Sequence, residues 1–456
     1  MGKALGFAWR LCGKNAPIGL KGEAKMGTPR DRIRHSWVVC LCALAGFCIS
    51  VGRVPGQENS QIPQEGHGAE VAAAATKGLD TWSGKGCCPD DAGCGPGWCG
   101  WVGVEALGWA ISGQSVPPLV TSSPAGTPRE QAGVIGSPGT QVLYGNNPIN
   151  GQMLPGIRVY GGVFLDEEKT WGVNGSFFTL FGGGSNYLSP GGANPGAGDP
   201  VVSRPFINAI TGKNDAELVA FPGVLGGQAA VNSDMSFYGL DTNLFCNLCC
   251  GCDSRWDLLG GYRNMGLSEG LAINEYLTTL DTTLGYPANQ SILVNDSFNT
   301  RNTYNGGQIG VGYMRWNGKW SLDARALLGI GGTSSTVNIY GSTTVTPPGG
   351  MASTQPGGLL AQRTNMGEYS ANTLSFVPEV GVRLGYMVTP KVAITAGYTF
   401  LYWTGVARPG EQVDPVVNPT QIPPGSLIGP ARPAFNGVNT TDIWIQGVST
   451  GLEFRF

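Results

Sequence analysis

Residues 441–456, TDIWIQGVSTGLEFRF, form an alternating segment that ends the chain on an aromatic residue. Apolar side chains occupy the even positions Trp444, Val448, Leu452, Phe454 and Phe456. Small and polar residues occupy the odd positions Gly447, Ser449, Gly451, Glu453 and Arg455. Because successive side chains of a strand point to opposite faces, this stretch predicts a strand with one apolar face and one polar face.

The composition of the whole chain favours many such strands. The 456 residues include 74 glycines and 31 prolines, and only 13% are charged. Glycine and proline disfavour helices, and repeated alternation distinguishes a β protein from a disordered chain. Mean hydropathy is close to zero, as expected of a barrel with a lipid-facing side and a water-facing side. A formal net charge of −3 supplies no basic surface for phosphates, so we expect no nucleic-acid partner.

The first hundred residues resemble an export signal followed by a linker. Arg30, Arg32 and Arg34 lie just before the apolar run 37–51, which is short for a membrane-spanning helix. We interpret residues 1–51 as a signal segment, with Met26 as an alternative start. Residues 52–100 are expected to form a flexible periplasmic linker that carries a cysteine cluster.

From residue 101 onward, about twelve alternating segments follow one another. Each has roughly the nine to eleven residues that a tilted strand needs to cross an outer membrane. The clearest are 319–330, 374–388, 391–403 and 441–456, and the others are 101–111, 157–165, 169–181, 235–246, 254–265, 268–279, 292–300 and 304–316. For residues 101–456 we therefore predict an all-β fold, a transmembrane antiparallel β-barrel of about twelve strands within a range of ten to fourteen.

The connections between these segments are either tight or long. The tight ones are Asn317-Gly318, Thr389-Pro390 and residues 166–168. The long ones are rich in Gly, Pro, Asn and Ser, and comprise residues 112–156, 182–234, 341–373 and 404–441. If the C-terminus is periplasmic and the number of strands is even, every tight turn falls on the periplasmic side. The sequence thus predicts long extracellular loops and short periplasmic turns.

Aromatic residues gather near the predicted strand ends. Seven tryptophans do so: Trp101, Trp109, Trp171, Trp316, Trp320, Trp403 and Trp444. We expect these rings to form girdles at the two membrane interfaces; the alternative is a soluble all-β core that uses tryptophan as filler. Phe454 and Phe456 resemble the terminal signal by which outer-membrane barrels are recognised. Outer-membrane lipid and the barrel-insertion machinery are accordingly the expected partners.

Several stretches resemble the putative beta barrel porin-7 family of bacterial outer-membrane proteins. They include GVIGSPGTQVLYG at 133–145, DLLGGYRNMGLSEGLAINE at 257–275, VPEVGVRLGYMVTPKVAITAGYTFLYW at 377–403 and the terminal GLEFRF. The resemblance covers roughly residues 99–456. It implies the fold and a location in the bacterial outer membrane, and it supplies no catalytic site or transported substrate to carry over.

The residue types that are missing exclude several kinds of chemistry. The chain has two histidines, His35 and His67, and both precede the predicted barrel. A Ser-His-Asp triad or a histidine-containing zinc site therefore cannot form within the barrel. The glycines at 182–184 and 260–261 lack the lysine of a phosphate-binding loop. We expect no enzymatic activity, no metal and no cofactor.

Charged residues on the less apolar strand faces are expected to line the lumen. They are Arg158, Arg255, Asp257, Arg263, Asp323, Arg325, Glu379, Arg383, Glu453 and Arg455. Three same-face pairs stand two residues apart: Arg255 with Asp257, Asp323 with Arg325, and Glu453 with Arg455. One interpretation is that these pairs neutralise each other inside a narrow barrel. The other is a constriction that selects solutes.

Eight of the twelve cysteines lie outside the signal segment. They form two groups, Cys87, Cys88, Cys94 and Cys99 before the first strand, and Cys246, Cys249, Cys250 and Cys252 in one turn. Both groups fall on the periplasmic side, which is oxidising, so disulfides are the expected state. The Cys246 and Cys249 spacing also fits a metal-thiolate site, and free thiols are the third alternative.

Together these features predict an exported outer-membrane barrel that acts as a porin-like passive channel for small hydrophilic solutes. The mechanism would be diffusion through a polar lumen. The alternative is a closed structural or adhesive surface barrel whose function lies in the external loops 112–156 and 182–234. A twelve-stranded barrel has a size between filled and open barrels, so sequence does not choose between an open and a plugged lumen, and the oligomeric state stays open.

Overall fold

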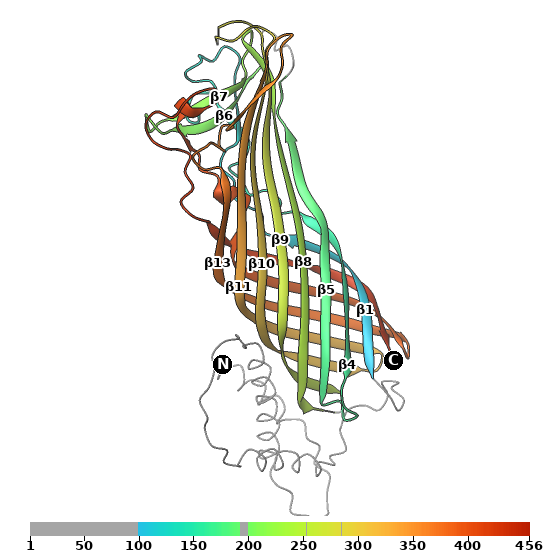
Figure 1. Cartoon of the computed structure of the whole chain (residues 1–456). Helices are drawn as coiled ribbons and strands as arrows, with labels where there is room; N and C mark the ends of the chain where they lie inside the picture. The colour runs from blue at the N-terminus through green and yellow to red at the C-terminus, as the bar shows by residue number, and fades with distance from the viewer. Residues whose placement is uncertain (1–98, 192–198, 252, 284) are drawn as a thin grey trace, which may run out of the picture.

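The structure is a computed structural model that describes residues 99–191, 199–251, 253–283 and 285–456. In this part of the chain ten antiparallel strands close into a barrel, which confirms the predicted transmembrane β-barrel (Figure 1). Around the ring the strands are β1 (Gly100–Ile111), β4 (Met153–Phe164), β5 (Trp171–Leu188), β8 (Leu225–Cys250), β9 (Ser254–Thr279), β10 (Ser291–Asn317), β11 (Trp320–Thr346), β13 (Gly367–Thr389), β14 (Val392–Ala407) and β16 (Thr440–Arg455). The predicted signal segment 1–51 and nearly all of the predicted linker 52–100 lie outside the described residues.

The ring has two strands fewer than the central estimate of twelve, and both differences have one cause. The predicted segments 254–265 and 268–279 belong to the single strand β9, and 292–300 and 304–316 belong to β10. Halfway along these strands, short or charged side chains such as Ser268 replace the apolar residues on the outer face. Because the apolar alternation stops at this point, the sequence pattern predicts a turn where the strand in fact continues.

The outer surface of the barrel consists of an apolar band and a polar wall. Near the end of the barrel that holds the C-terminus, outward side chains such as Val104, Val382 and Leu452 are apolar and exposed. Farther along, outward residues are short and polar, as in the cross-strand row Asp234, Gly270, Asn299 and Asn338. The 26 residues of β9 extend for about 85 Å, whereas an outer-membrane apolar band is about 25 Å tall. The long strands therefore continue well beyond the membrane.

Glycines allow the last strand to close against the first. Gly451 of β16 lies opposite Glu105 of β1, and a Cβ atom at Gly451 would collide with the carbonyl oxygen of Val104. Backbone hydrogen bonds between Gly100 and Phe456, with N–O distances of 3.0 Å in both directions, complete this seam. The glycines on the polar face of residues 441–456 thus allow the backbones of β16 and β1 to approach each other closely.

Connections at the C-terminal end of the barrel, hereafter the inner end, are tight. They are residues 165–170, 251–253, 318–319 and 390–391. At the opposite, outer end, the chain makes the longer connections 112–152, 189–224, 280–290, 347–366 and 408–439. The predicted arrangement of short turns and long loops is confirmed.

The long loops carry secondary structure of their own, which the sequence did not predict. Five short strands from three loops join in a second sheet: β2 (Val120–Ser123), β3 (Gln141–Tyr144), β6 (Val201–Asn208), β7 (Asn214–Ala220) and β15 (Val416–Val417). We call this sheet the cap. The loops also contain β12 (Ser353–Pro356) and the 3-10 helices η1 (Pro409–Gln412) and η2 (Pro419–Gln421). Within the described residues, no helix has the length and apolar character needed to cross a bilayer.

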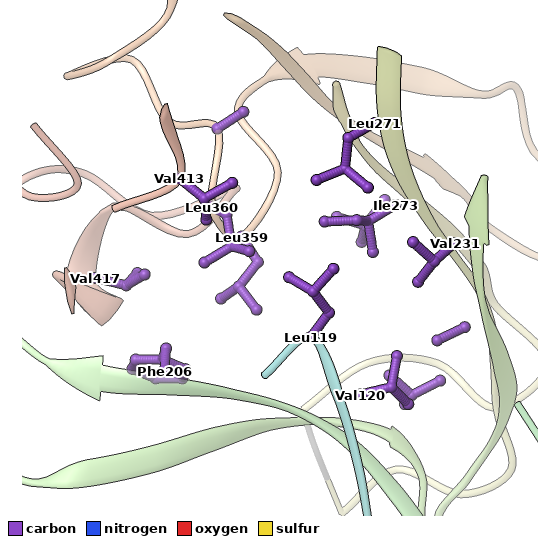
Figure 2. Packing of buried hydrophobic residues seen from close by; sticks show 14 of the residues in the cluster. Leu119, Val120, Phe206, Val231, Leu271, Ile273, Leu359, Leu360, Val413 and Val417 are labelled. Atoms are coloured by element: carbon purple, nitrogen blue, oxygen red, sulfur yellow. The ribbon is translucent and has the colours of Figure 1, made fainter. Parts of the chain in front are cut away.

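The cap packs against the extended part of the barrel wall. Figure 1 shows β6 and β7 beside the wall formed by β8 to β13, above the shorter strands. Leu119, Val120 and Phe206 of the loops meet Val231, Leu271 and Ile273 of the wall in one buried apolar cluster (Figure 2). Inward residues above the apolar band are thus covered by the loops, and the loops gain a hydrophobic core.

The tryptophans do not all lie in membrane girdles. Trp171, Trp320 and Trp444 are on outward positions, as predicted. The prediction is wrong for Trp101, Trp109, Trp316 and Trp403, because Trp101 packs on inward-facing Phe164, Trp316 lines an internal cavity, and Trp109 and Trp403 are buried inside the barrel. Several strands, such as 101–111, have apolar residues on both faces, so alternation alone does not identify the face that meets lipid.

Candidate functional site

The structure places all ten charged residues of the sequence analysis on the inner faces of their strands. Arg158, Arg255, Arg263, Glu379 and Glu453 are buried, whereas Asp257, Asp323, Arg325, Arg383 and Arg455 keep part of their side chains exposed. They gather in the half of the lumen nearest the inner end, level with the outer apolar band. Water or polar partners are therefore available to them only inside the barrel.

Two of the three predicted same-face pairs form, and the third does not. Arg255 contacts Asp257 with an N–O distance of 2.6 Å, and Arg455 contacts Glu453 at 2.8 Å. Asp323, however, pairs with Arg383 of the neighbouring strand at 3.1 Å. The register explains this choice, because Asp323 and Arg383 are directly opposite each other on β11 and β13.

Arg325 instead reaches a carboxylate that joins two sides of the lumen. Glu379 of β13 lies 2.6 Å from Arg325 through Oε1 and accepts a hydrogen bond from Arg263 of β9 through Oε2. β9 and β13 are not neighbours in the ring. The pair of Arg263 and Glu379 therefore crosses the lumen and limits its width.

Glu105, a fully buried acid among the charges near the inner end of the lumen, was missed by the sequence analysis. Its Oε2 accepts a hydrogen bond from Arg158 Nε at 2.7 Å, and its Oε1 lies 3.8 Å from Arg383. Arg158 Nη1 also contacts Thr399 on the far wall at 3.4 Å. Glu105 is the only charged residue of β1, and both faces of that strand carry apolar residues. Only the odd number of its position, which faces the lumen, could have identified it from the sequence.

A cavity of about 210 Å³ remains between these charges and the inner end of the barrel. Its lining includes Gly100, Trp316 and Arg455, which are located where the strands end. We call this cavity the inner chamber. Aromatic side chains line it together with the paired charges, so it offers both apolar and ionic surface.

Beyond the charges, toward the outer end, buried apolar side chains fill the lumen. Seventeen of them form one cluster and come from nine of the ten barrel strands: Leu107, Trp109, Ile111, Leu154, Phe178, Leu180, Met235, Phe237, Met265, Leu267, Tyr304, Val377, Leu401, Trp403, Val406, Ile443 and Ile445. We call this cluster the apolar layer. Each member is less than 9% exposed, so water is excluded from the level at which they meet.

Aromatic rings connect opposite walls through this layer. Phe237 of β8 and Trp403 of β14 have ring centroids 6.4 Å apart, although five strand steps separate β8 from β14 in either direction around the ring. Trp403 continues to Tyr304 at 6.2 Å, and its Nε1 donates to Thr333 Oγ1 at 2.9 Å. A contact between opposite strands leaves no central passage at this level.

The members of the predicted cysteine groups that the structure describes lie at the inner end of the barrel. Cys99 immediately precedes β1, and Cys246 and Cys249 are near the end of β8. Each of these three already has an interaction partner. Cys87, Cys88, Cys94 and Cys252 lie outside the described residues, and the bonding of the whole set stays a prediction. Within the described residues, no group of three or more acidic, cysteine or histidine side chains is arranged to hold a metal.

The C-terminal aromatic residues are on the outer surface. Phe454 and Phe456 are outward and exposed, with ring centroids 6.3 Å apart. They belong to the apolar band at the inner end and lie at the end of β16, which pairs with β1 to close the ring. This position agrees with a surface that another protein or lipid covers during assembly, and their role as an insertion signal stays a prediction.

Comparison with known proteins gives a family match in sequence and distant matches in structure. Residues 101–456 match the model of the putative beta barrel porin-7 family, whereas no curated protein matches the sequence. The outer membrane protease OmpT from Escherichia coli aligns with 10% identity and a TM-score of 0.37, over 78% of this chain and 97% of its own. A Pseudomonas aeruginosa FadL homologue has 8% identity and a TM-score of 0.20, with 79% and 90% covered. The Pseudomonas putida toluene transporter TodX has 8% identity and a TM-score of 0.18, with 80% and 90% covered. Similarity this low assigns none of their activities to this chain.

Proposed function

The chain belongs to the putative beta barrel porin-7 family, and from this premise we propose that it is a bacterial outer-membrane barrel that is closed and acts as a structural or adhesive surface protein. The observation that supports this most directly is the contact between Phe237 and Trp403, which joins opposite strands through the apolar layer. A hydrophobic constriction stops ions by excluding water from the pathway. Hydrophilic solutes would have to displace packed aromatic rings to pass.

A structural or adhesive protein of this kind would make its contacts through the outer end of the barrel. The cap and the polar wall extend beyond the apolar band, and their loops present exposed apolar side chains at Ile210, Leu427 and Ile428. A contiguous apolar patch is suited to contact with other surfaces, and Leu427 and Ile428 are adjacent in the chain. We expect cells that display the native chain to adhere more strongly to other surfaces than cells that display equal amounts of the Leu427→Ser, Ile428→Ser variant. Thr354→Ala, on the exposed β12 edge, is the matched control and should leave adhesion unchanged.

Assembly and anchoring follow from the outer surface of the barrel. The apolar band would contact outer-membrane lipid, and Phe454 and Phe456 would engage the barrel-insertion machinery. Residues 1–51 would direct export. For the cysteines at the inner end we propose disulfide bonding, since the periplasm is oxidising. Mass mapping under non-reducing conditions tests this, and eight free thiols in the isolated membrane protein would remove the idea.

Liposome swelling tests the closed barrel with hydrophilic solutes. Vesicles that contain the full chain should swell in an isotonic sugar solution no faster than protein-free vesicles. Heat-modifiable migration on a gel confirms that the barrel in those vesicles is folded. Swelling at the rate given by an open porin of known pore size would contradict the proposal.

A passive channel is the second candidate, and the inner chamber is the observation that favours it. Charged side chains in that chamber would bias the passage of ions if the apolar layer moved aside. Under this alternative the layer is a gate, and swelling would occur with the native chain. Catalysis remains unexpected under both candidates, because residues 101–456 contain no histidine.

A further inference from the structure

The inner chamber has two chemically different walls. One wall is aromatic: Trp101 and Phe164 have ring centroids 5.6 Å apart, and Phe245 lies 5.6 Å from Phe164 and 6.2 Å from Trp101. The guanidinium of Arg255 covers Phe164 at 5.1 Å, and Asp257 neutralises this arginine in a bidentate contact, accepting from Nε through Oδ2 and from Nη2 through Oδ1. The wall is therefore a compact apolar surface without an unmatched charge.

The other wall presents one carboxylate and one guanidinium with unused hydrogen-bonding capacity. Asp323 and Arg325 are two residues apart on β11, so they share one face with Cα atoms about 7 Å apart. Asp323 Oδ2 accepts from Arg383 at 3.1 Å, and its Oδ1 has no hydrogen bond among the described residues. Arg325 contacts Glu379 at 2.6 Å, which leaves most of its five N–H donors for other partners. Both side chains are more than a quarter exposed, at 29% and 28%, and both line the chamber.

The charges around the chamber are balanced. Five arginines and four carboxylates line it, and Arg263, Glu105 and Glu379 stand directly behind them in ion pairs. Adding these gives six positive and six negative groups. A ligand with a net charge would leave one group of this set unpaired in a site enclosed by protein, which is costly. A ligand with one charge of each sign would not.

We propose that the inner chamber binds a small zwitterionic molecule with an aromatic ring, the chemistry of an aromatic amino acid. The carboxylate of the ligand pairs with Arg325, its ammonium pairs with Asp323, and its ring packs on the wall of Trp101, Phe164 and Phe245. The ligand enters from the inner end, because the apolar layer closes the other side. The cavity of about 210 Å³ exceeds the 150 Å³ that suffices for benzene in an apolar cavity. This inference is independent of the proposed function, since a binding site of this kind needs neither adhesion nor conduction.

Three probes of nearly equal size test the proposal on the full chain in detergent. They are L-phenylalanine, 3-phenylpropionate, which lacks the ammonium group, and phenethylamine, which lacks the carboxylate. By calorimetry we expect L-phenylalanine to bind at least about 10-fold more tightly than either analogue, because each loses a charge-assisted hydrogen bond. Equal affinities for the three probes, or no binding of L-phenylalanine, would overturn the proposal.

Substitutions assign each charge to its partner. Asp323→Asn should weaken L-phenylalanine binding about 10-fold without weakening 3-phenylpropionate, because only the former has an ammonium group and the anionic probe can pair with the arginine that Asp323 leaves. Arg325→Gln should weaken L-phenylalanine binding without weakening the binding of phenethylamine, which has no carboxylate to lose a partner. Arg301→Gln, on the polar outer wall, is the matched control and should alter none of the three affinities. A variant of Asp323 or Arg325 that weakens all probes equally would indicate a structural role and refute the assignment.

Discussion

Arg408, which follows β14, forms a bidentate ion pair with Glu269 of β9, with Nε–Oε2 and Nη2–Oε1 distances of 2.9 and 2.6 Å. Both side chains are buried. The remaining Nη1 donates to the carbonyl oxygen of Ser112 at 2.6 Å, just beyond the end of β1. One arginine therefore ties the start of loop 408–439 and the end of the first strand to a wall on another side of the barrel.

Removal of Arg408 should loosen the cap without opening the membrane-embedded part of the barrel. Arg408→Ala leaves the Glu269 carboxylate buried without its partner, which costs about 3–5 kcal/mol. We expect amides of residues 408–439 to exchange with deuterium correspondingly faster, while amides of β16 keep their protection. The double variant Arg408→Met, Glu269→Met should recover much of this loss, because no unpaired charge remains.

The contact between Arg432 and Asp414 provides the control for that experiment. Its N–O distance is 2.9 Å, but the arginine side chain is 40% exposed. An exposed pair contributes about 0–1 kcal/mol, so Arg432→Ala should change exchange little. Equal effects of Arg408→Ala and Arg432→Ala would contradict the importance of the buried pair.

Glu217 of β7 should make the stability of the cap depend on pH. Its enclosed carboxyl is close to the network in which Arg204 contacts Glu275 at 2.6 Å and Asp296 at 2.7 Å. Burial raises the pKa of Glu217 well above its usual value, the charge of Glu275 raises it further, and Arg204 opposes both. The folded cap thus retains a proton that the unfolded carboxyl loses above about pH 4.3, and stability falls as pH rises from there toward the raised pKa.

Glu217→Gln, which is neutral at every pH, should remove the part of this dependence that comes from Glu217. Hydrogen exchange of cap amides measured from pH 5 to pH 9, corrected for intrinsic rates, should show a steeper fall of protection in the native chain than in the variant, which keeps only the titration of Glu275, whose pKa burial also raises. The exposed Glu130→Gln serves as the matched control and should keep the native slope. An unchanged slope in Glu217→Gln would show that another group titrates.

Sequence predicted the faces of the C-terminal strands correctly because those faces differ in polarity. Val380, Val382 and Leu384 alternate with Glu379, Gly381 and Arg383, and each set lies where alternation places it. The extent of β9 and β10 was not predictable in this way, since lipid contact ends midway while pairing continues. Hydrogen bonding, rather than burial, defines those strands.

The closing elements of the lumen were hidden from sequence for a different reason. Trp109 and Trp403 are apolar residues on strands whose two faces both contain apolar residues. Arg408 and Glu269 lie 139 positions apart, and no local pattern connects them. Both features depend on which strands are opposite in the ring, which is a property of the closed barrel and not of any segment.

Truncation of the rings in the apolar layer should open the barrel. Trp109→Ala together with Trp403→Ala removes the two largest side chains of the layer, at a cost of about 3–5 kcal/mol each. We expect liposomes with this double variant to swell in sugar solutions that leave native vesicles unchanged. Trp444→Ala, on the outer face, changes a tryptophan without touching the lumen and should not permit swelling.

The terminal aromatic residues should affect assembly more than stability. Phe456→Ala removes an exposed ring at the end of the closing strand, so the folded barrel loses little burial, but recognition of the chain end would weaken. In cells we expect less folded protein in the outer membrane and more in the periplasm. Phe400→Ala, an outward ring farther from the chain end, should leave membrane yield near native. Similar losses of membrane yield for both variants would show that the terminal rings are not a specific recognition signal.

Single-channel recording in planar bilayers tests the closed lumen most directly. The native full chain, shown to be folded by its heat-modifiable migration, should insert without discrete current steps, while the Trp109→Ala, Trp403→Ala variant should give them under the same conditions. Regular current steps from the native chain, with amplitudes similar to those of the variant, would contradict a barrel sealed by its apolar layer.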